Sequence, residues 1–240
     1  MKSLLEITEK YLYLVLGWER NYVDRFLAPS DFMRTKLIEY GIPENKVTTL
    51  PYFIDSTKYR PNYEPGKYIL YFGRLSEEKG LKVLLKVMKQ LPRIKLVIAG
   101  TGPQEEELRM MNSELGNRNV EFVGFKSGHE LLNLIENCRF TVLPSVWYEV
   151  FGLSILESFA CGKPVIASNI GGMPEVIDHG ENGLLVKPDN VSELSDAIDN
   201  LWKSVTRIRN MGKIGRNITE KKYNKAIHYD QIMRIYSKYL

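Results

Sequence analysis

The sequence offers little support for disulfide or metal chemistry. Only two cysteines occur among the 240 residues, and there is no Asp-x-Asp, the close spacing of carboxylates that often holds a metal ion. We interpret Cys138 and Cys161 as buried, reduced thiols, because one ends a helical run and the other lies beside a glycine turn. Reduced thiols are typical of cytoplasmic proteins.

Long apolar runs are also absent. A membrane-spanning helix needs about 18 or more apolar residues, and the longest candidate, residues 11–17, is far shorter and flanked by charges. This stretch also lacks the small-residue cleavage site of a signal peptide. We therefore expect a cytoplasmic protein, and the hydrophobic share of 44% and charged share of 26% are ordinary for a soluble globular chain.

The net charge of +4 is mild but unevenly distributed. Nine basic side chains lie between residues 207 and 238, against only Glu220 and Asp230. No recognisable nucleic-acid-binding module accompanies them, so we do not expect nucleic acid as a partner. A solvated helix surface is the simplest interpretation of this stretch.

Strand and helix patterns alternate from residue 67 onward, which predicts an α/β fold with a parallel sheet covered by helices. The run at residues 68–72 is apolar throughout, as in a strand buried on both faces. The further strands are expected at residues 94–99, 120–123, 140–143, 165–167 and 184–186. The helices are expected at residues 81–91, 104–115, 130–136, 153–160, 175–178 and 191–203, where Asn190 and Glu193 make a capping box for the last.

The first fifty residues follow a different pattern. Their periodicity predicts a helix at residues 4–18, a short strand at residues 25–28, a helix at residues 31–40 and a strand at residues 46–50.

The most informative segment is residues 144–165, PSVWYEVFGLSILESFACGKPV. A predicted strand ends just before it, and an apolar helical run begins just after Gly152. A glycine that opens a helix straight after a strand leaves backbone N–H groups free to bind a phosphate. Glu149 should lie at the rim of that cleft, and Glu157, about two helical turns further on, could accept hydrogen bonds from ribose hydroxyls. A single glutamate is more often a solvated surface residue, but the pair around Phe151 and Gly152 favours a binding site.

Arg74 and Lys79 follow the strand at residues 68–72 and the turn at Gly73. The carboxyl ends of parallel strands face one cleft, so both side chains can reach a phosphate there. Arginine can grip phosphate oxygens as a planar fork, and lysine acts as a compact charge. The alternative is that both are solvated loop charges paired with Glu77 and Glu78. The neighbouring glutamate pair favours phosphate binding.

Neither the histidines nor a partial dinucleotide-binding motif indicates a functional site. We interpret His129, His179 and His228 as surface or capping residues. The turn at residues 100–105 begins Gly-Thr-Gly but has Glu105 where a G-x-G-x-x-G motif needs its third glycine, which disfavours a nicotinamide cofactor.

Glu149 and Glu157, spaced E-x7-E around Phe151 and Gly152, resemble the signature of the retaining group 1 (family 4-like) glycosyltransferases. That family has two facing Rossmann-like domains, the GT-B fold, and uses nucleotide sugars as donors. Further segments match the family in the same order, from residue 22 to the C-terminus. These are YFGRLSEEKG at residues 71–80, VIAGTGP at 97–103, VEFVGF at 120–125, PVIASNIGGMPE at 164–175 and NGLLV at 182–186.

The resemblance implies a catalytic set of Arg74, Lys79 and Glu149. The two basic side chains would stabilise the departing diphosphate without a metal ion or other cofactor, and Glu149 would bind hydroxyls of the donor sugar. Glu157 would bind the ribose, backbone groups near Phe125 and Lys126 would border the base, and the backbone after Phe151 would hold the diphosphate and sugar. The donor-binding set is Gly73, Phe125, Lys126, Phe151, Gly152, Leu153 and Glu157.

By the same resemblance, residues 1–50 are a remnant of the N-terminal acceptor domain and residues 51–66 the interdomain linker. Residues 67–217 are the Rossmann-like nucleotide-sugar-binding domain, and residues 218–240 a C-terminal crossover helix. Tyr52 and Phe53 replace the usual Asn-Gly of the linker, so we expect a stiffer hinge. The rest of the acceptor domain has no counterpart in this sequence.

These features imply that the chain supplies the donor-binding half of a hexosyl-type transferase acting on a glycan or lipid-linked acceptor. We expect it to bind a nucleotide sugar but to transfer the sugar extremely slowly by itself. We also expect self-association or a separate N-terminal domain chain as partner, and the basic C-terminal stretch could contact the inner face of a membrane. A non-catalytic nucleotide-sugar-binding subunit or relic is the alternative. A sugar-nucleotide epimerase is disfavoured by the glutamate pair.

Overall fold

The computed structural model describes residues 22–238, which form two compact units that divide between Pro51 and Tyr52. We describe each unit by itself. The helix expected at residues 4–18 lies outside the described residues.

The N-terminal unit contains a small parallel sheet and one helix. Strand β1 (Phe26–Ala28) pairs in parallel with β2 (Val47–Thr49), and α3 (Asp31–Glu39) lies between them in the chain. The Ser30 side chain caps α3 by accepting a hydrogen bond from the amide of Met33 at 3.1 Å. The expected strand, helix and strand are therefore confirmed. The small core of this unit is formed by Ala28, Ile42 and Val47.

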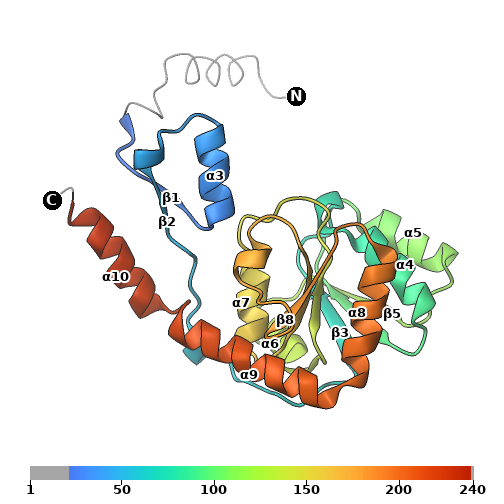
Figure 1. The fold of residues 1–240 in the computed structure, drawn as a ribbon. Helices are drawn as coiled ribbons and strands as arrows, with labels where there is room; N and C mark the ends of the chain where they lie inside the picture. The colour runs from blue at the N-terminus through green and yellow to red at the C-terminus, as the bar shows by residue number, and fades with distance from the viewer. Residues whose placement is uncertain (1–21, 239–240) are drawn as a thin grey trace, which may run out of the picture. The chain divides into compact units, whose positions relative to one another are not determined.

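The larger unit is built on a six-stranded, fully parallel sheet with the strand order β5-β4-β3-β6-β7-β8 (Figure 1). The chain adds strands on one side of β3 and then returns to add the rest on the other side, which is a doubly wound topology with a switch point between β3 and β6. The predicted α/β fold class is confirmed. The strands are β3 (Tyr68–Phe72), β4 (Lys95–Ala99), β5 (Val120–Gly124), β6 (Thr141–Leu143), β7 (Val165–Ser168) and β8 (Gly183–Val186).

Helices cover both faces of this sheet because successive strand residues point to opposite sides. Along β3, Ile69 and Tyr71 join the core under α4 and α8, whereas Leu70 and Phe72 join the core under α6. No helix within residues 22–238 is long and apolar enough to cross a membrane. The helices are α4 (Leu81–Gln90), α5 (Glu105–Glu114), α6 (Gly128–Asn137), α7 (Leu153–Ala160), α8 (Val191–Lys203), α9 (Val205–Lys221) and α10 (Lys225–Tyr236).

The helix expected at residues 175–178 is wrong. Only a short 3-10 turn forms, at Met173–Glu175. The Asn182 side chain explains the difference, because its Oδ1 accepts a hydrogen bond from the amide of Asp178 at 2.9 Å and its Nδ2 donates to the carbonyl of Val176. A side chain thus takes the backbone bonds that a helix would have used. The other strands and helices expected between residues 67 and 203 lie within two residues of their predicted bounds. The single helix expected at residues 218–240 is instead divided, because α9 ends at Lys221 and α10 begins at Lys225.

Of the interdomain linker expected at residues 51–66, residues 52–66 pack on the larger unit. The amide of Ile54 donates to the carbonyl of Tyr223 at 2.8 Å, and the amide of Asn62 donates to the carbonyl of Cys161 at 2.9 Å. The segment therefore belongs to the body of the larger unit. The boundary expected at residue 218 falls inside α9.

Three buried groups lie together beneath this segment. Cys138 and Cys161 are buried free thiols, as expected, and burial raises the pKa of Cys138 to about 12. The Lys163 ammonium is also buried, which lowers its pKa, and it donates to the carbonyl of Glu64 at 2.8 Å. A thiol with so high a pKa is inert, which supports a packing role for both cysteines.

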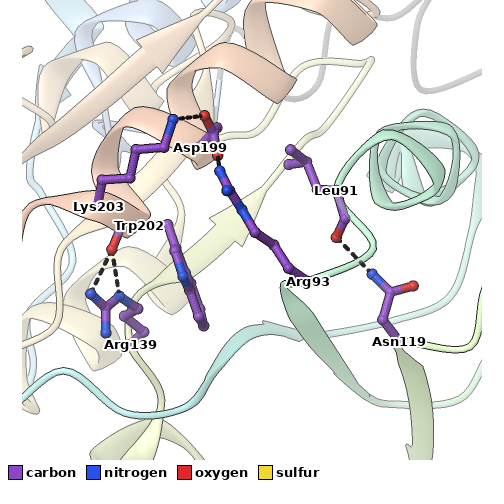
Figure 2. A network of polar contacts seen from close by, with 7 residues as sticks. All are labelled: Leu91, Arg93, Asn119, Arg139, Asp199, Trp202 and Lys203. Carbon is purple, nitrogen blue, oxygen red and sulfur yellow. Dashed lines mark hydrogen bonds and ion pairs between the residues drawn. The ribbon is translucent and has the colours of Figure 1, made fainter.

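Polar side chains form hydrogen bonds and ion pairs at the edge of the sheet where its strands begin (Figure 2). Arg139, just before β6, donates through Nε to the carbonyl of Trp202 at 3.0 Å and lies 4.5 Å from the centre of its ring. Arg93, just before β4, pairs with Asp199 of α8, which also pairs with Lys203. These contacts tie the strand starts to α8, at the edge opposite the candidate site.

Asn119, just before β5, joins the start of that strand to the loop before β4. Its Nδ2 donates to the carbonyl of Leu91 at 2.9 Å, as Figure 2 shows. It also donates to the carbonyl of Ile94 at 2.7 Å, in the loop that leads into β4. With a longer bond to the carbonyl of Met88 at 3.3 Å, one side-chain amide thereby reaches three backbone acceptors next to the core.

Replacing Asn119 by alanine should lower the free energy of unfolding by about 1–3 kcal/mol, because the carbonyls of Leu91 and Ile94 each lose a hydrogen bond from its side chain. Asn210→Ala is the matched control, since Asn210 is exposed on α9. The control should change stability by at most about 0.7 kcal/mol, in the stabilising direction, through helix propensity. Urea denaturation of both variants measures the difference, and equal values would contradict the structural role of Asn119.

Candidate functional site

The loops that follow β3 and β6 meet at the carboxyl edge of the sheet. The amide of Val146 donates to the carbonyl of Glu78 at 2.9 Å, so the two loops run against each other. Gly80 has a φ of 69°, and a Cβ at that position would lie 1.9 Å from the carbonyl oxygen of Pro144. Only glycine fits this contact. It fixes the backbone next to Lys79.

The loop after β3 is also joined to the loop after β4. The amide of Gly73 donates to the carbonyl of Ala99 at 3.0 Å, and the amide of Leu75 donates to that of Thr101 at 2.9 Å. A Cβ on Gly100 would lie 1.9 Å from the carbonyl oxygen of Gly73. The start of the predicted phosphate loop is therefore held by backbone contacts on both sides.

Lys79 and Glu149, 70 positions apart in the chain, form an ion pair at this edge. Lys79 Nζ lies 2.6 Å from Glu149 Oε1, and the side chains are 26% and 21% exposed. The buried Ser145 donates from its hydroxyl to the same oxygen at 2.8 Å. Both donors use Oε1, and no described residue donates to Oε2. The second oxygen is thus available to an incoming donor.

The main chain of Glu149 is held by a third loop, the one after β7. The amide of Gly172 donates to the carbonyl of Glu149 at 2.7 Å. A Cβ on Gly171 would lie 2.3 Å from the same carbonyl oxygen. The missing Cβ of Gly171 therefore lets this loop pass directly over Glu149, and the amide of Gly172 bonds to its carbonyl.

The Arg74 side chain is exposed at the same edge. The Tyr71 hydroxyl donates to the carbonyl of Arg74 at 2.7 Å, which fixes its backbone. The pKa of Glu78 is lowered mainly by the hydroxyl of Ser76 and, to a smaller extent, by the charges of Lys79 and Arg74. Arg74 and Lys79 thus place two positive charges on this loop, beside the carboxylates of Glu77 and Glu78.

Helix α7 begins at this edge, directly after Phe151 and Gly152. Gly152 has a φ of 94°, and no side chain of the described residues caps the helix. Phe151 is buried and packs edge-on against the rings of Tyr52 and Tyr223, with ring centres 5.6 Å apart in each pair. Its buried ring anchors the turn, and the backbone at Gly152 and the half-exposed Leu153 presents the positive end of the helix dipole.

Glu157 lies on the second turn of α7 and is partly buried. Burial raises the pKa of its carboxyl, and a hydrogen bond from Tyr59 opposes that rise. Arg216 of α9 donates through Nη1 to the carbonyls of Tyr59 at 3.1 Å and Ala160 at 2.5 Å. Tyr59 is therefore fastened beside the same helix that carries Glu157.

Phe125 and Lys126 follow β5, which is two strands away from β3 in the sheet. Phe125 is 70% exposed, and Lys126 pairs with Glu130 of α6 at 3.2 Å. The structure thus brings Lys79 and Glu149 into direct contact. Among the described residues, Phe125, Lys126 and Glu157 make no hydrogen bond or ion pair with either of them.

Sequence reasoning missed Ser145 and Tyr59. The position of Ser145 could have been predicted, because it follows the end of β6 by two positions and must lie at the carboxyl edge of the sheet. The position of Tyr59 could not, because it lies in the segment expected to be a linker. The structural interpretation of His179 is supported, because its Nδ1 accepts a hydrogen bond from the amide of Leu185 at 3.1 Å.

Comparison with known proteins identifies the family of this chain. The family model for glycosyl transferases group 1 matches residues 55–218. An uncharacterized glycosyltransferase of Methanocaldococcus jannaschii is 39% identical over 137 residues, which cover 55% of this chain and 35% of that protein. A glycogen synthase of Mycobacterium tuberculosis is 32% identical over 200 residues, covering 79% of this chain and 48% of that protein.

Solved structures show the same fold. The crystal structure of HepE from Anabaena in complex with UDP-glucose has a TM-score of 0.87 and 23% sequence identity, covering 98% of this chain and 70% of that one. This chain spans about a third to a half of the length of the curated relatives named above. Because the family model matches more than half of the sequence, the chain belongs to the glycosyl transferases group 1 family.

Proposed function

We propose that this chain binds a nucleotide sugar at the carboxyl edge of its parallel sheet and supplies the donor-binding half of a glycosyltransferase. The observation that carries the proposal is the ion pair between Lys79 and Glu149 near the uncapped start of α7. A nucleotide sugar presents an anionic diphosphate joined to a sugar rich in hydroxyls. The cation and helix start suit the first part, and the carboxylate suits the second.

Arg74, Lys79 and the start of α7 would stabilise the charge that develops on the departing diphosphate. Groups fixed before the bond breaks are the most effective, because they need no reorganisation during reaction. The helix terminus adds about 0.3–1 kcal/mol, and up to about 2 kcal/mol where it is partly buried. No group of three or more His, Cys, Asp or Glu within residues 22–238 is arranged to hold a metal ion. We propose that the basic side chains act in place of a metal.

Glu149 and Glu157 would recognise the two hydroxyl-rich parts of the donor. Oε2 of Glu149 is positioned to accept hydrogen bonds from the sugar, and Glu157 would accept them from the ribose. The exposed backbone near Phe125 and Lys126 would border the base. The diphosphate would lie between these regions, against Gly73 and the backbone of Gly152.

We further propose a hexose donor, retention of configuration and a glycan or lipid-linked acceptor. The E-x7-E signature supports retention, and the relatives support a hexose and a glycan, since one is a glycogen synthase and the fold neighbour HepE was solved with UDP-glucose. The basic stretch from α9 onward would suit peripheral contact with an anionic membrane.

A melting-temperature screen tests the proposal directly. UDP, GDP, ADP, CDP and dTDP, each with its glucose conjugate, would be added singly to the protein. A ligand that binds the folded state raises the melting temperature by mass action. We expect at least one base to give such a rise, and no shift with any compound of the panel would contradict nucleotide-sugar binding.

Arg74→Ala and Lys79→Ala should each weaken binding of the selected nucleoside diphosphate far more than binding of the bare nucleoside, because only the former carries the charge they neutralise. Lys82→Ala is the matched control, since Lys82 lies three residues after Lys79 but pairs with Glu107 on the surface. Calorimetry measures both ligands, and equal losses for nucleoside and diphosphate would count against a phosphate role.

Glu157→Gln should weaken nucleotide binding about ten- to a hundredfold, because a hydrogen bond to a charged group contributes about 1.5–3 kcal/mol. Glu114→Gln, at an exposed position on α5, is the control and should leave binding unchanged. If the Glu157→Gln variant folds normally and binds as tightly as wild type, Glu157 is not a ribose ligand.

The raised pKa of Glu157 adds a dependence on pH. The carboxyl must be ionised to accept ribose hydroxyls, so nucleotide affinity should be full above its pKa and fall as the pH drops through it. Because burial raises this pKa, the fall should begin above the pH of an ordinary glutamate, which titrates near about 4.3. Calorimetry across pH should show the fall in wild type and not in Glu157→Gln. The same profile in both proteins would contradict the assignment.

A further inference from the structure

The ion pair between Lys79 and Glu149 joins two side chains that the proposed function assigns to different parts of the donor. Lys79 would bind the diphosphate, and Glu149 would bind the sugar. At 2.6 Å, Lys79 Nζ makes a direct hydrogen bond to Oε1 of Glu149. A diphosphate that draws Lys79 away from Glu149 would weaken or break that bond.

We propose that Glu149, through this ion pair, makes the site prefer the nucleotide sugar over the nucleoside diphosphate that remains after transfer. The inference rests on the proposed function. With the full donor, the diphosphate takes Lys79 and the sugar hydroxyls donate to Glu149 in its place. With the bare diphosphate, Glu149 loses Lys79 and gains no new donor, so the broken pair opposes binding. Such a preference favours release of the product.

Ser145 is the positioning residue in this arrangement. Its buried hydroxyl donates to the same oxygen as Lys79, at 2.8 Å, and the amide of Gly172 holds the Glu149 main chain. Glu149 therefore stays in place when Lys79 moves to the diphosphate. A carboxylate that is only about one-fifth exposed and keeps one neutral donor is poorly solvated, so it favours a ligand that brings hydroxyls.

The expected effect is moderate. Fully exposed ion pairs contribute little, and breaking fully buried ones is strongly destabilising. With side chains 26% and 21% exposed, this pair lies between those limits. We therefore expect the bare diphosphate to bind about three- to tenfold more weakly than it would without the pair.

The first test uses Glu149→Gln with the nucleoside diphosphate selected by the melting-temperature screen and with its glucose conjugate. Calorimetry should show about three- to tenfold tighter binding of the diphosphate, because Lys79 is no longer engaged. The conjugate should bind more weakly than to wild type, because a neutral side-chain amide accepts sugar hydroxyls less well than a carboxylate. Unchanged or weakened diphosphate binding would overturn the inference.

The second test repeats the substitution in a Lys79→Ala background. If Glu149 acts by engaging Lys79, Glu149→Gln should no longer tighten diphosphate binding there. Direct repulsion between Glu149 and the phosphates would instead tighten binding equally in both backgrounds. That result would overturn the inference, and the double-mutant cycle separates the two causes.

The third test concerns Ser145. Ser145→Ala should weaken binding of the glucose conjugate more than binding of the bare diphosphate, since only the sugar donates hydrogen bonds to Glu149. Ser158→Ala is the control, because Ser158 is equally buried and donates to the carbonyl of Ser154 within α7. Equal weakening of both ligands by Ser145→Ala would show a structural role only and would overturn the positioning role.

The outcomes distinguish this inference from the proposed function. If no compound of the screen binds to wild type, both fail. If wild type binds the diphosphate and Lys79→Ala weakens it, but Glu149→Gln fails to tighten it, the proposed function stands and the preference for donor over product is rejected.

Discussion

The site depends on backbone loops that approach one another too closely for side chains to separate them. Gly80 lies against the carbonyl of Pro144, and Gly100 lies against that of Gly73, so a Cβ at either position would meet an oxygen at 1.9 Å. These contacts join the loops after β3, β4 and β6 into one rigid edge. Because the loops are fixed to each other, Lys79 and Glu149 meet although 70 positions separate them in the chain.

At this rigid edge, Lys79 and Glu149 form an ion pair that is only partly exposed to solvent. The carboxylate of Glu149 takes both of its donors on one oxygen, and the uncapped start of α7 adds the partial positive charge of a helix terminus. A partly buried charged group that lacks hydrogen-bond partners costs free energy. The arrangement suits a ligand that is anionic in the middle and rich in hydroxyls at both ends, and a nucleotide sugar is such a ligand.

The sequence predicted the larger unit well because its strands are buried on both faces, which gives continuous apolar runs such as residues 68–72. It also placed Arg74, Lys79 and Glu149 at one edge, since residues after parallel strands share an edge. It did not predict the Lys79–Glu149 bond or the part of Ser145, because side-chain contacts between distant loops have no local signature. The helix expected at residues 175–178 did not form because the Asn182 side chain bonds to the amide of Asp178 and the carbonyl of Val176.

The central claim is that the diphosphate of a nucleotide sugar binds between Lys79 and the start of α7. A crystal structure with the bound nucleotide sugar from the melting-temperature screen tests it most directly. The account predicts phosphate oxygens within hydrogen-bond distance of Lys79 Nζ and of the first amides of α7, with a sugar hydroxyl on Glu149. A nucleotide bound elsewhere, with the Lys79–Glu149 bond intact at 2.6 Å, would contradict it.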